Sequence, residues 1–89
     1  RIIAEKNMYL NQKIKYTSRK TTREKLMAYL TDQAKLKRSN DFTIPFNRQE
    51  LADYLGVERS AMSAELGKLT KLGILRTQRS HFTLLKPLD

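Results

Sequence analysis

The amino-acid sequence predicts a mainly α-helical fold with a small β wing, which places the chain in the α+β class. Two helical segments are separated by a glycine at position 56, and a capping pattern precedes each of two predicted helices. A stretch of alternating apolar and polar residues follows the last helix. Because a tight turn between two helices followed by a β-hairpin is typical of a winged helix-turn-helix, we expect this architecture.

The first helix of the helix-turn-helix is predicted from the residues at its two ends. Asn47 occupies an N-cap position and Glu50 follows three residues later, a close relative of the capping box that satisfies free backbone N–H groups. Gly56 stands where this helix should end, because glycine reaches the left-handed conformation at little cost. The first helix should therefore be short.

The second helix is predicted over about residues 58–72. Its apolar residues recur at helical spacing and define one buried stripe, formed by Met62, Leu66, Leu69 and Leu72. Gly73 provides a second stop signal. Helical hairpins with a glycine between the helices also occur in many bundles, so spacing alone leaves a purely structural interpretation open.

The residues after the second helix predict a β-hairpin over residues 74–85, which we call the wing. Two alternating segments flank a polar tip at Gln78 and Arg79. A further strand is predicted at residues 42–46, ahead of the helix-turn-helix. Pro45 restricts this strand to a sheet edge or a strand end, since proline cannot donate a ladder hydrogen bond.

The N-terminal part of the chain predicts two more helices. A capping pattern from Thr21 to Glu24 starts one of them, and its polar end lies near residues 37–40. Residues 2–16 predict the other, with a seam of coiled-coil type formed by Ile3, Asn7, Leu10 and Ile14. The seam is typical of the end of a dimerisation helix, and a frayed, solvated basic helix is the alternative.

These elements predict two parts of the chain. Residues 1–19 form the C-terminal part of a dimerisation helix and a hinge, and residues 20–89 form the winged-helix domain. Because the chain begins with Arg1 and not with methionine, we expect it to be a fragment or a processed product.

The charge of the chain points to a polyanionic partner. The 89 residues carry 18 Lys and Arg against 9 Asp and Glu, a net charge of +9. Residues 1–39 account for +8 of this charge, from 11 basic and 3 acidic side chains, and residues 40–89 for +1, from 7 and 6. Nucleic acid is the commonest partner of such a chain. The nearly neutral second half favours a site with a few specific contacts over a purely electrostatic one.

Several function classes are not supported by the sequence. The chain has no cysteine, so neither a disulfide framework nor a thiolate metal site can form within it. No apolar run approaches the roughly 18 residues of a membrane span, and nothing resembles a signal peptide, so we expect no membrane partner and a cytoplasmic location. The single histidine, His81, lacks a catalytic or metal-binding constellation. We therefore predict no enzyme activity, no metal and no cofactor, and expect His81 to face solvent on the wing.

The order of these elements resembles the C-terminal winged-helix domain of the Crp/Fnr superfamily of bacterial transcription regulators. The resemblance covers about residues 20–85, and its most specific part is RQELADYLGVERSAMS. It implies a homodimeric, sequence-specific protein that binds double-stranded DNA and can contact RNA polymerase. It also implies a sensor domain ahead of this chain, whose effector the resemblance does not identify.

The resemblance implies roles for individual residues. Base-reading positions at the front of the recognition helix are occupied by Arg59, Ser60, Ser63 and Ala64. The predicted phosphate contacts are Arg48, Gln49, Lys68, Arg76, Gln78, Arg79 and Ser80. A helix N-terminus such as that at Arg48 attracts phosphate through its free N–H groups and its dipole. An arginine such as Arg59 can present a bidentate fork to the O6 and N7 atoms of guanine.

The chain departs from the family pattern at two of these positions. Many members carry a base-reading arginine where Ala64 stands here, and often a glutamate where Ser60 stands. Ala64 offers only a methyl contact, for example to thymine. The half-site is therefore expected to be read largely through Arg59 and DNA shape, and neither the operator nor the sign of regulation transfers from the family.

Two other functions remain open from the sequence. A winged helix can serve as a protein–protein interaction module, and the nearly neutral second half supports this alternative. A weaker alternative is binding of structured RNA through the basic first half.

Overall fold

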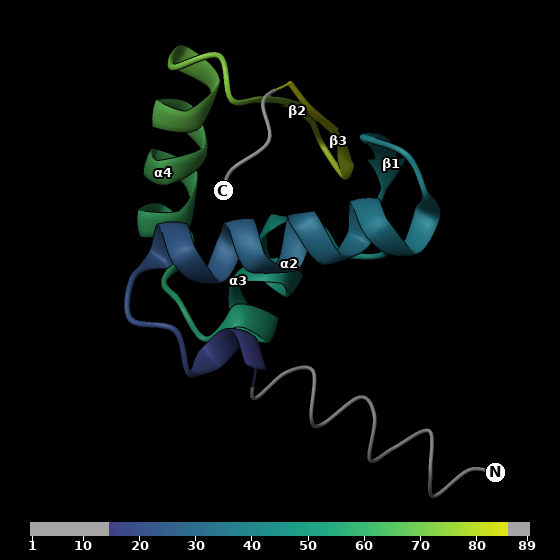
Figure 1. Cartoon of the computed structure of the whole chain (residues 1–89). Coiled ribbons are helices and arrows are strands. Elements are labelled where there is room, and N and C mark those ends of the chain that lie inside the picture. Colours follow the sequence, from purple (N-terminus) through teal and green to yellow (C-terminus); the bar gives the residue numbers. More distant parts are fainter. Residues whose placement is uncertain (1–14, 86–89) are drawn as a thin grey trace, which may run out of the picture.

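The structure is a computed structural model that describes residues 15–85 (Figure 1). The predicted seam residues Ile3, Asn7, Leu10 and Ile14 lie outside the described residues. Within them the elements follow in the order α2, β1, α3, α4, β2 and β3, which confirms the predicted winged helix-turn-helix. None of the helices in this part of the chain has both the length and the hydropathy that crossing a membrane requires.

Helix α2, Thr22–Lys37, begins and ends at the predicted signals. The hydroxyl of its N-cap residue, Thr21, accepts a hydrogen bond of 3.0 Å from the backbone N–H of Glu24. The Glu24 carboxylate accepts in turn from the N–H of Lys20, at 3.2 Å, one residue before the N-cap. The helix ends at Arg38, which adopts a left-handed conformation with φ 52° and donates its N–H to carbonyls of the last turn.

Helix α3, Arg48–Leu55, has the capping box that the sequence predicts. The side chain of Asn47 accepts from the N–H of Glu50, and the Glu50 carboxylate accepts from the N–H of Asn47, both at 2.8 Å. Gly56 ends the helix with φ 71°, the left-handed conformation expected of it.

Helix α4, Arg59–Lys71, lies within one residue at each end of the predicted range 58–72. Gly73 follows with φ 76° and completes the turn into the hairpin. The turn between α3 and α4 is therefore short, and the two helices form the predicted helix-turn-helix.

The sheet has three antiparallel strands in the order β1-β3-β2: Asp41–Thr43, His81–Leu84 and Leu75–Gln78. The wing hairpin is confirmed, but its tip is displaced by one residue from the prediction, because Gln78 pairs with His81 and the turn consists of Arg79 and Ser80. The first strand is shorter than the predicted range 42–46. Ile44 still donates its N–H to Ser80, at 2.9 Å, and Pro45 then ends the pairing because it has no N–H.

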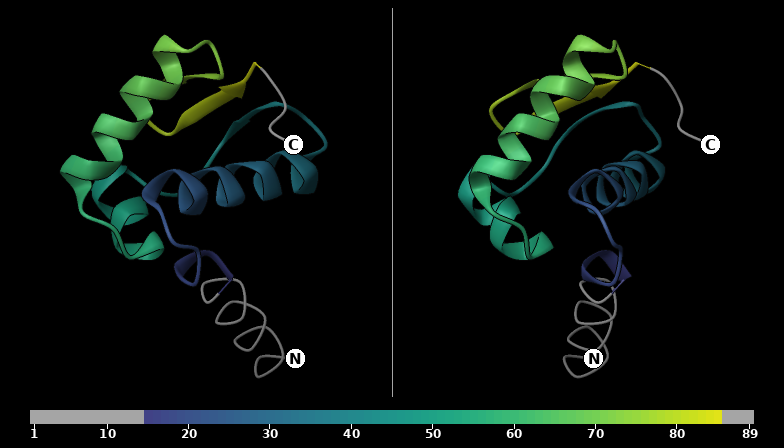
Figure 2. Two further views of the ribbon diagram at one scale, coloured as in Figure 1. Left: turned by 60° about the vertical axis from the view of Figure 1, so that its left-hand side comes forward. Right: turned by 90° about the vertical axis from the view of Figure 1, so that its left-hand side faces the viewer.

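The core lies where three helices and the sheet meet. Helix α4 stands across the N-terminal end of α2, and in the view of Figure 1 the sheet lies above α2 and α3 below it; Figure 2 shows the same arrangement from two further sides. The largest fully buried aliphatic residues come from every layer: Leu26, Leu30, Leu51, Leu55, Met62, Leu69 and Leu75. Within residues 15–85 no polar or charged side chain is buried. The core is thus entirely apolar or aromatic.

An aromatic cluster extends this core to the residues that precede α2. Tyr16 is 2% exposed, and its ring lies 5.4 Å from that of Tyr29 and 6.0 Å from that of Tyr54. The Tyr16 hydroxyl donates to Asp32 at 2.8 Å. Burial, followed by the contact with Asp32, raises the pKa of Tyr16 above its ordinary range. The predicted domain boundary between residues 19 and 20 remains a prediction, and a residue ahead of it packs on the core.

Candidate nucleic-acid interface

Helix α4 separates an apolar face from a polar one. Met62, Leu66 and Leu69 are buried against the domain, whereas Leu72, which was expected in the same stripe, follows the end of α4 and is 56% exposed. The four residues predicted to read bases are all exposed: Arg59, Ser60, Ser63 and Ala64. Because a helix places residues three and four apart on one side, the first turns of α4 present a polar face to solvent.

An ion pair ties the middle of α4 to α2. The Arg23 guanidinium pairs through Nε with the carboxylate of Glu65, whose side chain is only 15% exposed. This pair holds α4 against α2.

The N-terminus of α4 lacks a side-chain cap. Its N-cap residue, Glu58, makes no capping side-chain bond within the described part of the chain. The unsatisfied N–H groups of a first helical turn favour an anion. The exposed side chain of Arg59 adds a positive charge at the same end.

Arg48 joins the start of α3 to the wing. Its Nη2 donates to Thr77 Oγ1 at 2.7 Å, and its Nη1 donates to the backbone carbonyl of Arg79. The guanidinium also lies 5.1 Å from the centroid of the Phe82 ring, in cation–π geometry. Partial burial, and secondarily the positive charge of Arg59, lower the pKa of Arg48 from its ordinary value.

The wing tip has a second attachment to the segment before α3. Ser80 Oγ donates to the carbonyl of Phe46 at 2.6 Å, in addition to the backbone bond from Ile44. Arg79, the first residue of the tip, has φ 56°, a conformation that residues other than glycine adopt uncommonly. The tip is therefore a constrained turn and not a loose loop.

These elements enclose a hollow of about 420 Å3 between α3, α4 and the wing. Within residues 15–85 its lining consists of three arginines and three uncharged polar residues: Asn47, Arg48, Gln49, Arg59, Arg79 and Ser80. Five of these residues were predicted contacts with DNA. The concentration of positive charge in a concave polar site makes the hollow suitable for an anion such as a phosphate group.

The other predicted phosphate residues lie apart from this hollow. Arg76 and Gln78 line a second hollow of about 250 Å3 on the sheet, together with Thr77, His81 and Thr83. Lys68 is exposed in the last turns of α4, and it is not among the described residues that line either hollow. The structure thus distributes the predicted contacts over three places.

His81 is exposed, as expected, but it also links two strands. Its Nε2 faces the carboxylate of Asp41, and its Nδ1 lies 2.9 Å from Thr43 Oγ1. Thr83 Oγ1 donates to the same carboxylate at 3.0 Å. The hydrogen bonds from His81 and Thr83, in this order, lower the pKa of Asp41. No sequence signal indicated this contact, because it depends on the register of β1 against β3.

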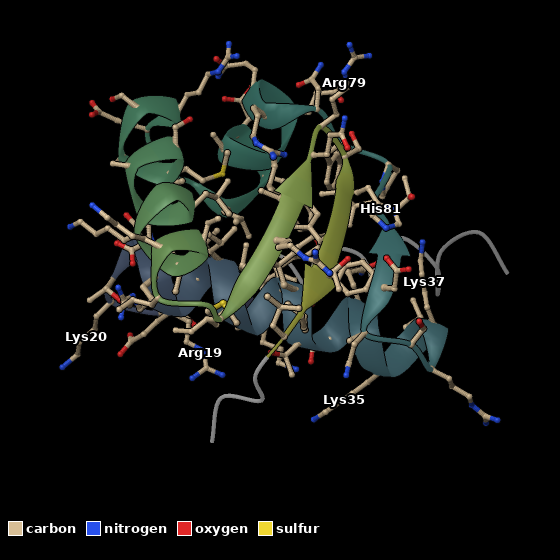
Figure 3. The ribbon with its side chains drawn as sticks, turned by 90° about the horizontal axis from the view of Figure 1, so that it is seen from above. Arg19, Lys20, Lys35, Lys37, Arg79 and His81 are labelled. Carbon is tan, nitrogen blue, oxygen red and sulfur yellow. The ribbon has the colours of Figure 1, made fainter. Side chains whose placement is uncertain are left out.

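Basic side chains of the first half occupy a different surface. Figure 3 places Arg19, Lys20 and Lys35 on the side of the molecule away from Arg79. Lys15 on this side pairs with Asp32 at 2.9 Å. These side chains therefore do not add to the positive charge of the hollow beside the wing. Within the described residues no group of three or more histidine or acidic side chains is placed to hold a metal ion.

Comparisons with known proteins agree with the fold. A family model, the Crp-like helix-turn-helix domain, matches residues 24–88. Among solved structures, a protein assigned to the Crp/Fnr family of transcriptional regulators, from Eubacterium rectale, superposes with a TM-score of 0.68 at 18% sequence identity. The superposition covers 94% of this chain and 38% of that protein, so this chain spans well under half of its length. A comparison with curated protein sequences found no match.

Proposed function

The chain belongs to the family of Crp-like helix-turn-helix domains, and from this premise we propose that it is the sequence-reading part of a dimeric transcription regulator. The observation that carries the proposal is the hollow of three arginines at the junction of α3, α4 and the wing. Here the start of α3, the exposed front of α4 and the wing tip meet. No enzymatic activity is proposed.

The polar face of α4 enters the major groove in this proposal. Arg59 presents its guanidinium to a guanine, and Ser60 and Ser63 donate or accept hydrogen bonds at neighbouring base edges. Ala64 contributes a methyl contact, which favours thymine. Because only one long side chain reads bases, sequence-dependent DNA shape supplies part of the specificity.

Phosphate groups are bound on both sides of the groove in this proposal. The hollow receives one phosphate, with the exposed side chains of Gln49 and Arg79 as its donors, whereas the predicted contact Ser80 already donates its hydroxyl to the carbonyl of Phe46. Lys68 on α4, and Arg76 and Gln78 on the sheet, approach phosphates farther along the backbone. Since Arg76 also lies near the carboxylate of Asp41, we expect its contribution to be smaller than that of Arg79.

The regulator as a whole is proposed to be a homodimer. Two copies of α4 then meet half-sites about one helical turn apart on a two-fold site. A sensor domain, contact with RNA polymerase and a cytoplasmic location complete the proposal. These three features are proposed from membership of the family, and no contact of the described residues supports them.

The test is a selection from random duplex DNA at about 150 mM salt, where unspecific phosphate attraction is partly screened. We expect enrichment of one half-site, found most often as an inverted repeat. The selection is then repeated with the chain fused into a forced dimer. Weak binding that vanishes as salt rises, in both forms, would overturn the proposal. Preference for structured RNA in direct competition would favour the alternative of RNA binding through the basic first half of the chain.

A further inference from the structure

We propose that Arg48 contributes to DNA binding as a positioning residue, by fixing the wing tip and the side chain of Arg79, and not chiefly by a phosphate contact of its own. This inference rests on the proposed function of the hollow. It assigns to Arg48 a different role from the phosphate contact that the sequence suggested.

The contacts of Arg48 reach three parts of the wing at once. One arm of the guanidinium donates to Thr77 in β2, the other donates to the carbonyl of Arg79 in the turn, and its face lies over Phe82 in β3. Thr77 extends this hydrogen-bond network to β3, since its hydroxyl donates to the backbone carbonyl of His81 at 3.0 Å. A planar guanidinium can make these contacts together, whereas a lysine ammonium has neither the fork nor the flat face.

The turn that Arg48 holds requires such support. Arg79 adopts φ 56° without being a glycine, so its backbone is less favourable by itself than an ordinary turn. The carbonyl that Arg48 binds belongs to this same residue. The direction in which the Arg79 side chain leaves the tip is therefore coupled to the presence of the Arg48 fork.

The position of the Arg48 guanidinium argues against a mainly external role. Arg48 is half-buried, and its two Nη atoms already donate to groups of the wing. Arg59 and Arg79, which line the same hollow, are both exposed. An incoming phosphate meets these two side chains more freely, because their charges are not committed to wing acceptors.

The experiment uses conservative variants that keep the charge or the shape. Arg48→Lys keeps the positive charge and loses the fork, and Thr77→Val removes both the acceptor of the Arg48 bond and the bond that the same hydroxyl donates to the carbonyl of His81. Gln49→Ala is the matched control, because Gln49 lines the same hollow but its amide donates to Asp53 within α3, at 3.0 Å. Hydrogen exchange of the backbone amides of residues 76–82 is followed by NMR in the absence of DNA.

In the free chain, Arg48→Lys and Thr77→Val should each accelerate exchange of the wing amides, with about a tenfold effect for the loss of a charge-assisted hydrogen bond. Gln49→Ala should leave the exchange of these amides unchanged. Unchanged exchange in Arg48→Lys would overturn the proposal. A Thr77→Val effect that stays the same in the Arg48→Lys background would also overturn it, because that effect would then come from the lost bond to His81 alone.

Binding to the selected duplex is then measured over a range of salt concentrations. Arg48→Lys should weaken binding in the otherwise unmodified chain and have little further effect when Arg79 is already alanine. A phosphate contact by Arg48 itself predicts the opposite: lysine largely preserves affinity, and Arg48→Ala lowers the salt slope by about 1 even in the Arg79→Ala background.

The two proposals fail in different ways. Normal duplex binding by both the unmodified chain and Arg48→Lys would overturn the positioning role alone. Absence of duplex binding by the unmodified chain, even as a forced dimer, would overturn the proposed function and this role of Arg48 with it.

Discussion

The junction between α3 and the wing differs from the outward face of the sheet in how it uses ionisable side chains. At the junction, the half-buried Arg48 bonds to Thr77 and to Arg79 and lies over a buried ring. On the outward face, Asp41 and His81 pair with side chains 63% and 48% exposed. Water competes with an exposed pair far more than with a partly buried one. The hydrogen bonds of Arg48 at the junction should therefore stabilise the fold more than the pair of Asp41 and His81 on the outward face.

The comparison also separates the roles of the two places. The junction supports a concave, positively charged surface, whereas the outward face carries a carboxylate that offsets the charge of Arg76. Burial therefore indicates which contacts hold the wing, and exposed charge indicates which residues remain available to a partner.

Replacement of Phe82 by alanine should have the largest effect, because this side chain is fully buried and also lies beneath Arg48. The free energy of unfolding should fall by about 3–5 kcal/mol, measured by urea denaturation. Phe82→Leu is the control, since it keeps most of the apolar volume and removes the ring. Faster exchange of wing amides in Phe82→Leu would assign the contact to the ring, and unchanged exchange would contradict the importance of the cation–π geometry.

Among the exposed residues of the junction, Arg59 should contribute most to the specificity of binding for one DNA sequence. Arg59→Ala should weaken binding to the selected duplex by about 1–3 kcal/mol and relax specificity at one base position. Arg79→Ala should weaken all sequences alike and lower the salt slope by about 1, which makes it the matched control. Fluorescence anisotropy on selected and random duplexes measures both. Equal losses of Arg59→Ala on the two duplexes would exclude a base-reading role.

The ion pair of Arg23 with Glu65 is less exposed than the pair of Asp41 with His81, so its loss should lower the free energy of unfolding more. Arg23→Ala should lower the free energy of unfolding by about 1 kcal/mol, because Arg23 itself is 43% exposed and solvent screens the pair. Lys25→Ala on the same helix provides a control for the change in net charge. A loss no larger than that of the control would mean that packing alone positions α4.

The smallest effect is expected on the outward face. The pKa of Asp41 is held below its ordinary value of 3.8, first by the hydrogen bond from His81 and then by that from Thr83. A lowered pKa in the folded state stabilises the fold above pH 3.8, and this contribution disappears as the pH falls through the lower, folded-state pKa. In Asp41→Asn, acid unfolding should lack the part of the loss of stability that comes from protonation of Asp41 below pH 3.8. An identical pH dependence in both proteins would show that the pair contributes nothing.

The local parts of the fold could be predicted because the decisive atoms lie close together in the sequence. The capping box joins residues three apart, Asn47 and Glu50, and the left-handed Gly56 ends the same helix. Helix α4 was placed within one residue at each end for the same reason, since its apolar stripe repeats within the helix itself. Such signals require no knowledge of what packs against them.

The contacts that organise the candidate interface could not be predicted in this way. Arg48 meets the wing 29 and 31 residues later, and Arg23 meets Glu65 across 42 residues. These pairs depend on how α2, α3, α4 and the sheet pack, and any of several basic residues could have filled each place. The sequence therefore identified the charged residues of the hollow but not the division between those that hold the wing and those that face outward.

The packing of Tyr16 has a mechanical consequence. The residues that lead into the domain are fastened to α2 through Asp32, and to the aromatic cluster through Tyr29 and Tyr54. The neighbouring Thr17 lies against the turn of the helix-turn-helix, where its Cγ2 would be 3.4 Å from a Cβ placed on Gly56. A force applied through the residues ahead of Tyr16 would thus be transmitted to α2 through Asp32 and to α3 through Tyr54, and not only along the backbone.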